Sequence, residues 1–161
     1  MATTPSTNYT GRVIDLSIFQ FDGERLSGDL ELAYGSPVKI ITGMEKAKQA
    51  WLSVFLTAKN SALFEPNRGT FFGEVVGQTN IDTSTIEHVA NIATVETMNI
   101  VTDDQLGSTK EIPDDEYIVG AQVLDIMSDV NDPSQLLLQI GLKNRAGAVF
   151  TVYAPLAIGI S

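Results

Sequence analysis

The chain contains no cysteine and a single histidine, His88. The absence of cysteine excludes disulfide bonds and thiolate metal sites, and it agrees with a protein made in a reducing cytoplasm. One histidine without any cysteine leaves too few nitrogen and sulfur ligands for a zinc site of the usual kind, and it leaves a nucleophilic triad unsupported. We therefore expect neither a metal nor any other cofactor.

Basic residues are also scarce, with 10 Lys and Arg against 20 Asp and Glu and a formal net charge of −10. Nonspecific nucleic-acid binding depends on cations that neutralise phosphates, so we expect no nucleic-acid partner. The acidity either keeps the protein soluble or orients it against a basic partner. Most of the excess negative charge lies between residues 102 and 132, where Lys110 is the only basic residue.

No apolar run approaches the roughly 18–20 residues that a membrane-spanning helix needs, so we expect no membrane span. Hydrophobic residues nevertheless make up 43% of the chain, which excludes bulk disorder. A length of 161 residues suits one well-packed domain with a small extension. We divide the chain into an N-terminal extension or arm, residues 1–37, and a folded domain, residues 38–161.

Two helices are predicted in the middle of the chain. The first has Thr-Gly-Met-Glu at residues 42–45 as a capping box, and the second spans residues 85–99, with Ser84 and Glu87 as its capping box. An acidic loop is expected at residues 103–115. The spacing of the apolar residues of the first helix places them on one face. These residues are Met44, Ala47, Trp51, Val54 and Phe55.

Strands are predicted at both ends of the chain. Alternating patterns indicate strands within residues 11–21 and at residues 29–34, with a turn at Asp22-Gly23. The last third predicts a meander of strands at residues 116–126, 135–142 and 148–154, with a bulge at Gly120. This order favours an α+β fold, in which two helices pack on a mainly antiparallel sheet with an N-terminal β-rich extension.

Few side chains suggest catalysis. A pair of carboxylates among Glu65, Glu74 and Glu96 would be needed to cleave a glycosidic bond, but their spacing does not distinguish them from the other acids, for which surface charge or ion pairs are the plain interpretation. Trp51 lies on the apolar helix face and is interpreted as core. The alternative is a partner anchor, because tryptophan is enriched at interface hot spots.

The order of the central motifs resembles the small baseplate wedge family of contractile phage tails and related injection machines, the T4-type wedge subunit historically labelled tail-lysozyme-like. The resemblance covers roughly residues 38–154. Glu96 stands where the family often has Glu-Pro-Arg, although Thr97 and Met98 follow it here. The matching residues are Ile-Thr-Gly at 41–43, Gln49, Phe-Leu-Thr-Ala-Lys-Asn-Ser at 55–61 and Pro-Asn-Arg-Gly-Thr-Phe-Phe at 66–72.

This resemblance implies a structural protein, not an enzyme, in the baseplate of a virion tail assembled in the host cytoplasm. Its partners would be other wedge proteins and sheath or tube proteins in a multi-copy assembly. The final strands would offer an exposed edge to which a partner adds a strand. The residues expected to mediate interactions are Trp51, Glu65, Pro66, Arg68, Gly69 and Glu96.

Two other functions stay open at this point. One is a phage-tail carboxylate glycosidase that acts on peptidoglycan, with acids such as Glu65 and Glu74. The other is a small adhesin-type or carbohydrate-binding module, for which Tyr117 and Tyr153 are candidate solvent-facing aromatic residues on strands.

Overall fold

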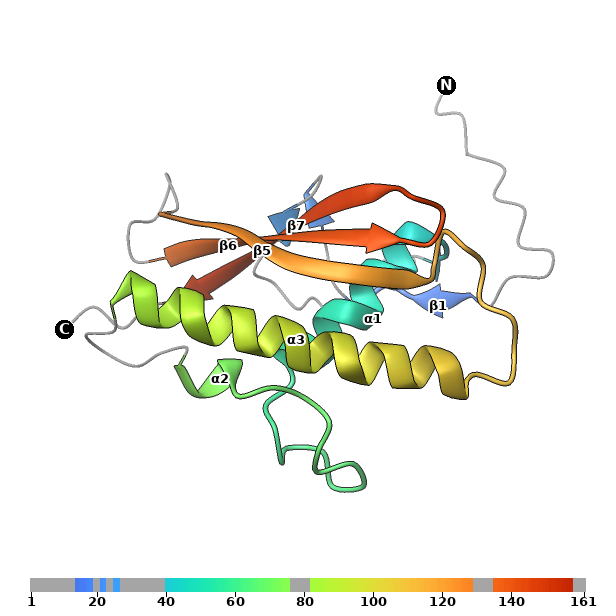
Figure 1. Cartoon of the computed structure of the whole chain (residues 1–161), viewed down its shortest axis with the longest axis horizontal. Helices are drawn as coiled ribbons and strands as arrows, with labels where there is room; N and C mark the ends of the chain where they lie inside the picture. Colours follow the sequence, from blue (N-terminus) through green and yellow to red (C-terminus); the bar gives the residue numbers. More distant parts are fainter. Residues whose placement is uncertain are drawn as a thin grey trace, which may run out of the picture.

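The computed structural model describes residues 14–18, 21–22, 25–26, 40–75, 82–128 and 135–157. Its described elements are three helices and seven strands (Figure 1). The helices are α1 (Met44–Leu56), α2 (Phe72–Val75) and α3 (Thr83–Gly107). The strands are β1 (Asp15–Leu16), β2 (Phe21–Asp22), β3 (Arg25–Leu26), β4 (Ile40–Ile41), β5 (Ile118–Ser128), β6 (Gln135–Asn144) and β7 (Val149–Ala157).

The main sheet is built on the antiparallel meander β5–β6–β7, in the strand order β2-β3-β7-β6-β5. The short β3 joins β7 through one parallel register pair, Arg25 with Tyr153. Along β6, alternate side chains face the core because successive residues of a strand point to opposite faces. The buried set is Leu136, Leu138, Ile140 and Leu142.

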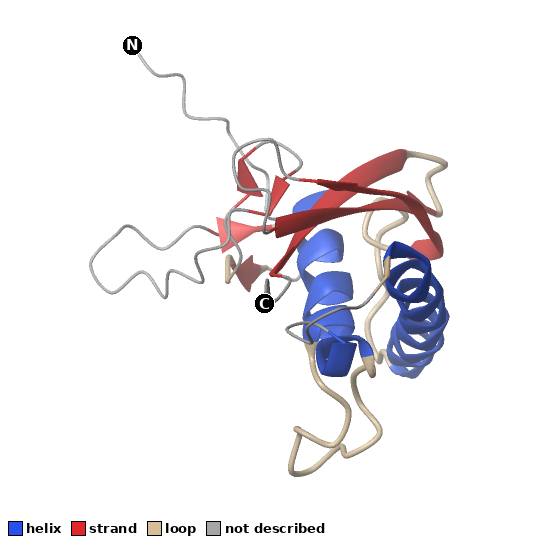
Figure 2. Ribbon diagram, turned by 90° about the vertical axis from the view of Figure 1, so that its left-hand side faces the viewer, coloured by secondary structure: helices blue, strands red, loops and turns tan. Residues whose placement is uncertain are grey.

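Both long helices lie on the same face of this sheet (Figure 2). Trp51 and Phe55 of α1 are fully buried there, with their ring centroids 4.9 Å apart, and Phe72 of α2 lies 4.7 Å from Phe55. Burying a side chain of this size contributes roughly 1.5–3 kcal/mol. The predicted α+β class is therefore confirmed, with the four-residue α2 as a short addition to the two expected helices.

The start of α1 differs from the predicted capping box at residues 42–45. Gly43, rather than Thr42, is the N-cap residue, with φ of 63°, and it has no side chain with which to cap the helix. The carboxylate of Glu116, 73 residues later, instead accepts a hydrogen bond from the Gly43 N–H at 2.9 Å. A negative charge at a helix N-terminus is also stabilised by the positive end of the helix dipole. The capping-box prediction was wrong because the acceptor comes from a distant segment.

Helix α3 is longer than predicted, since it begins at Thr83 and continues to Gly107. Its N-cap is Asp82, whose Oδ1 accepts from the Thr85 N–H at 2.7 Å, so the expected Ser84 capping box is also wrong. The first part of the expected acidic loop, residues 103–107, is the last turn of the helix. Val101 is buried there, and an ion pair described below fixes Asp104.

Strand β5 carries the predicted bulge, a register shift between Ile118 and Gly120, and a second shift between Val123 and Asp125. Strand β6 pairs with β5 on one side and with β7 on the other. The expectation that residues 135–142 and 148–154 offer an exposed edge was therefore wrong, because the sheet order places β6 between β5 and β7, and β7 between β6 and the short β3. The described partner of β5 is β6 alone, so β5 is an edge strand.

The N-terminal extension contacts the domain through β1, which pairs antiparallel with β4 in a separate two-stranded ribbon. The buried side chain of Gln49 binds the same segment, since its Oε1 accepts from the Ile18 N–H at 2.6 Å and its Nε2 donates to the Leu16 carbonyl at 2.8 Å. Strands β2 and β3 pair on either side of the predicted Asp22-Gly23 turn. The predicted strand at residues 29–34 and the proposed boundary at residue 37 lie outside the described residues.

Candidate functional site

The segment between α1 and α2, which we call the 57–71 loop, projects away from the helices and the sheet (Figures 1 and 2). Its base is closed by main-chain hydrogen bonds from Thr70 N–H to the Thr57 carbonyl at 2.9 Å and from Lys59 N–H to the Thr70 carbonyl at 3.0 Å. The buried Thr70 hydroxyl donates to the Phe55 carbonyl at 2.9 Å and accepts from the Phe72 N–H at 3.2 Å. These bonds tie the base of the loop to both flanking helices.

The Pro-x-x-Gly motif has a clear backbone role in this loop. Gly69 has φ of +104°, and a Cβ added there would lie 2.4 Å from the Thr57 carbonyl oxygen, so no side chain fits. Asn60 has φ of 66°, a conformation that asparagine tolerates better than most residues. The Asn60 N–H donates to the Pro66 carbonyl at 2.9 Å and closes the loop a second time, nearer its tip.

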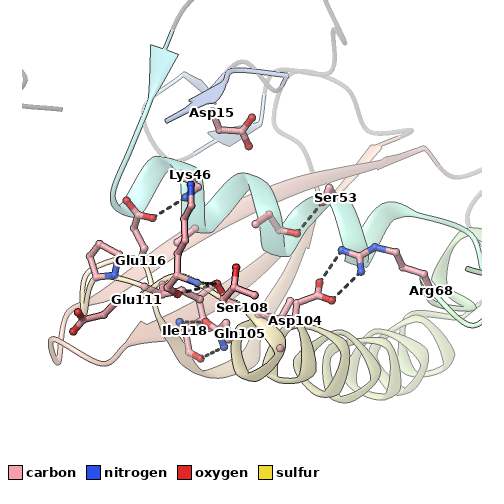
Figure 3. A pocket seen from close by; sticks show the side chains of 18 residues that line it. Asp15, Lys46, Ser53, Arg68, Asp104, Gln105, Ser108, Glu111, Glu116 and Ile118 are labelled. Carbon is pink, nitrogen blue, oxygen red and sulfur yellow. Dashed lines mark hydrogen bonds and ion pairs between the residues drawn. The ribbon is translucent and has the colours of Figure 1, made fainter. Parts of the chain in front are cut away.

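Two ion pairs brace the loop against α3. Arg68 forms a bidentate pair with Asp104, with N–O distances of 3.1 and 2.8 Å (Figure 3). The Asp104 hydrogen bond is the main reason that the pKa of Arg68 is raised above its ordinary value, and the charge of Glu65, 3.5 Å away, adds to it. Lys59 pairs with Glu96 at 3.1 Å. Planar, bidentate arginine pairs of this kind fix orientation as well as charge.

A cleft of about 670 Å³ lies beside this brace, between α1, the end of α3 and the segment that leads to β5 (Figure 3). Three cations line it, Lys46, Arg68 and Lys110. Lys46 forms an ion pair with the buried Glu116 at 2.9 Å, and Arg68 forms one with Asp104. The first pair joins α1 to the segment before β5, and the second joins the 57–71 loop to α3.

The free edge of β5 is occupied at two points. The Gln105 side chain accepts from the Ile118 N–H at 2.7 Å and donates to the Ile118 carbonyl at 3.0 Å, as a neighbouring strand would. The Asp125 carboxylate accepts from the Ile126 N–H at 2.8 Å. Side chains that bind the edge backbone, and bulges in the strand, hinder the pairing of another strand with an edge strand.

The structure brings five of the six predicted interaction residues together and separates the sixth. Glu65, Pro66, Arg68 and Gly69 belong to the 57–71 loop, and Glu96 is the α3 partner of its Lys59. Trp51 is 0% exposed, so the prediction that it belongs to the core is confirmed, and it presents no surface to a partner.

Sequence reasoning missed the exposed tip of the loop, the Asp104 carboxylate that holds the loop and the Glu116 carboxylate that caps α1. Leu63 and Phe64 are 86% and 92% exposed. The sequence did contain a sign of this exposure, because the two large apolar residues are adjacent inside a polar turn. Asp104 and Glu116 had no local signal, since their partners lie 36 and 70 residues away in the sequence.

No protein-family model, no curated protein and no solved structure matches this chain. Among the helices that the structure describes, none has the length and apolar character to cross a membrane. The described residues also contain no group of three or more His, Cys, Asp or Glu side chains placed to hold a metal ion.

Proposed function

We propose that this protein is a structural component of a tailed-phage baseplate, of the contractile type. In this role it joins wedge proteins to one another and to sheath or tube proteins, and it has no catalytic activity. The proposal starts from the sequence resemblance over roughly residues 38–154. The single observation that carries it further is the bracing of the 57–71 loop by ion pairs to α3.

This bracing is what a connecting protein needs. Arg68–Asp104 and Lys59–Glu96 link the loop to a helix 36 and 37 residues further along the chain. Lys46–Glu116 links α1 to the segment before β5. The charged side chains thus hold separate elements in one arrangement, so that a surface reaches its partners already ordered, which lowers the entropic cost of assembly.

The acidic character of the chain indicates the kind of surface that it meets. With a net charge of −10, the protein is attracted to basic surfaces of neighbouring proteins, and complementary charge orients such encounters. The exposed carboxylate of Glu65 lies within the loop itself. We therefore propose basic contact surfaces on the partner proteins of the wedge, sheath or tube.

A deletion and complementation experiment tests this function. Removal of the coding sequence from the source phage is expected to stop tail assembly before complete baseplates form, and the intact gene supplied in trans is expected to restore it. Complete, infectious particles without this chain would contradict the proposal. In that case cell-wall clearing by the purified protein is the next assay. If the protein is a carboxylate glycosidase, Glu65→Gln and Glu74→Gln should abolish the clearing.

A further inference from the structure

The tip of the 57–71 loop carries the two most exposed large hydrophobic side chains in the described part of the chain, Leu63 and Phe64. Single exposed apolar residues are common on protein surfaces and need no explanation. Here two of them are adjacent, within the turn that the main-chain bond from Asn60 to Pro66 closes. The loop that carries this turn stands clear of the helices (Figure 2). Their placement leaves apolar area that the described residues of the chain do not bury.

Hydrogen bonds hold the rest of the 57–71 loop in one conformation. Main-chain bonds close it at two levels, from Thr70 to Thr57 at 2.9 Å and from Asn60 to Pro66 at 2.9 Å. A further turn bond, Arg68 N–H to the Glu65 carbonyl at 2.9 Å, lies directly after the tip. An element that is ordered before binding loses little conformational entropy on binding, and more of its contact energy appears as affinity.

We propose that Leu63 and Phe64 form a plug that enters an apolar pocket on a neighbouring protein of the assembly. The inference rests on the proposed function, because it assigns a contact of the same assembly to these two residues. An aromatic side chain in a dry pocket is the usual centre of an interface hot spot. Glu65, next to the plug, is 64% exposed even though Arg68 lies 3.5 Å from its carboxylate, so a basic residue at the rim of that pocket would complement its charge.

A protein pocket fits this tip better than a lipid surface does. Segments that insert shallow apolar side chains into membranes carry Lys and Arg, which are attracted to anionic head groups. The residue that follows this plug is acidic, and the two cations of the loop, Lys59 and Arg68, are already ion-paired with α3. With a net charge of −10 on the chain as a whole, an anionic bilayer would repel it.

The test compares purified source particles with the free protein by hydroxyl-radical footprinting and mass spectrometry. We expect Leu63 and Phe64 to react readily in the free protein and to be at least about tenfold protected in the particle, as burial in a hot spot implies. If the chain is in the particle but both residues react as they do in the free protein, the plug is overturned while the proposed function stands. If the chain is absent from the particle, both are overturned.

A matched pair of variants provides the second measurement. Leu63→Ala and Leu106→Ala make the same change at two exposed leucines, 86% and 72% exposed, so neither is expected to alter thermal unfolding much. In cells that also express the wild type, we expect Leu63→Ala and Phe64→Ala to enter particles at least about tenfold less than Leu106→Ala. Equal incorporation would overturn the plug. If the wild type binds phosphatidylglycerol vesicles and Phe64→Ala abolishes that binding, the plug is overturned and the tip is a membrane contact instead.

Discussion

Replacement of Gly69 by alanine tests the geometry of the 57–71 loop most sharply. Gly69 has φ of +104°, and the added Cβ would lie 2.4 Å from the Thr57 carbonyl oxygen. The left-handed conformation costs a non-glycine residue about 1–2 kcal/mol. Because that carbonyl accepts the Thr70 N–H bond at the loop base, relief of the clash also weakens a hydrogen bond worth about 0.5–1.5 kcal/mol.

Together these costs predict that Gly69→Ala lowers the free energy of unfolding by roughly 1.5–3.5 kcal/mol. For a chain of this length the midpoint of thermal unfolding should fall by roughly 3–14 °C. The assay is thermal unfolding followed by circular dichroism, with two other glycines as controls.

The controls separate backbone conformation from close contact. Gly147 has φ of +86° with nothing within 4 Å of an added Cβ, so Gly147→Ala should lose only the conformational part. Gly107, at the end of α3, has open space and no positive φ, so Gly107→Ala should be neutral or slightly stabilising. If Gly69→Ala destabilises no more than Gly147→Ala, the close approach of Gly69 to Thr57 is refuted.

Three further predictions concern the residues that hold the domain together. Glu116→Gln removes the charge at the N-terminus of α1 and should lower the free energy of unfolding by about 1–3 kcal/mol in urea titrations, and an unchanged midpoint would contradict the distant cap. Hydrogen bonds from Thr85 and Ser84 lower the pKa of Asp82, so its stabilisation is complete above the ordinary aspartate pKa and is lost as pH falls through the lowered value. Asp82→Asn, which keeps a capping oxygen but does not titrate, should therefore differ from the wild type in thermal unfolding near neutral pH and converge with it in acid, whereas a constant difference would argue against the cap. Gln49→Leu should speed amide exchange at Ile18 while the buried part of α1 stays protected, and unchanged exchange would show that another contact holds the N-terminal segment.

Local patterns were sufficient for the elements whose structure depends on near neighbours. The apolar spacing that includes Trp51 and Phe55 predicted α1 and its buried face, because helical residues three and four apart share a side. Apolar-rich segments separated by turn residues predicted the last three strands, although β5 begins and ends two residues later than residues 116–126. Gly120 marked a bulge that the register of β5 with β6 confirms.

The errors occurred where distant residues decide the outcome. Residues 103–107 resemble a loop by composition, yet Arg68 from another segment pairs with Asp104 and Gln105 binds the backbone of Ile118. The α1 cap comes from Glu116 for the same reason. The pattern also could not separate exposed from buried apolar residues in a turn, so the exposure of Leu63 and Phe64 appears only in the folded structure.

The most direct test of the assembly role is cryo-electron microscopy of intact tails from the source. We predict density for this α+β domain in the baseplate, in repeated copies, with the 57–71 loop against a neighbouring protein. A baseplate whose density is fully assigned to other chains, with this chain absent by mass spectrometry of the same particles, would contradict the assembly role.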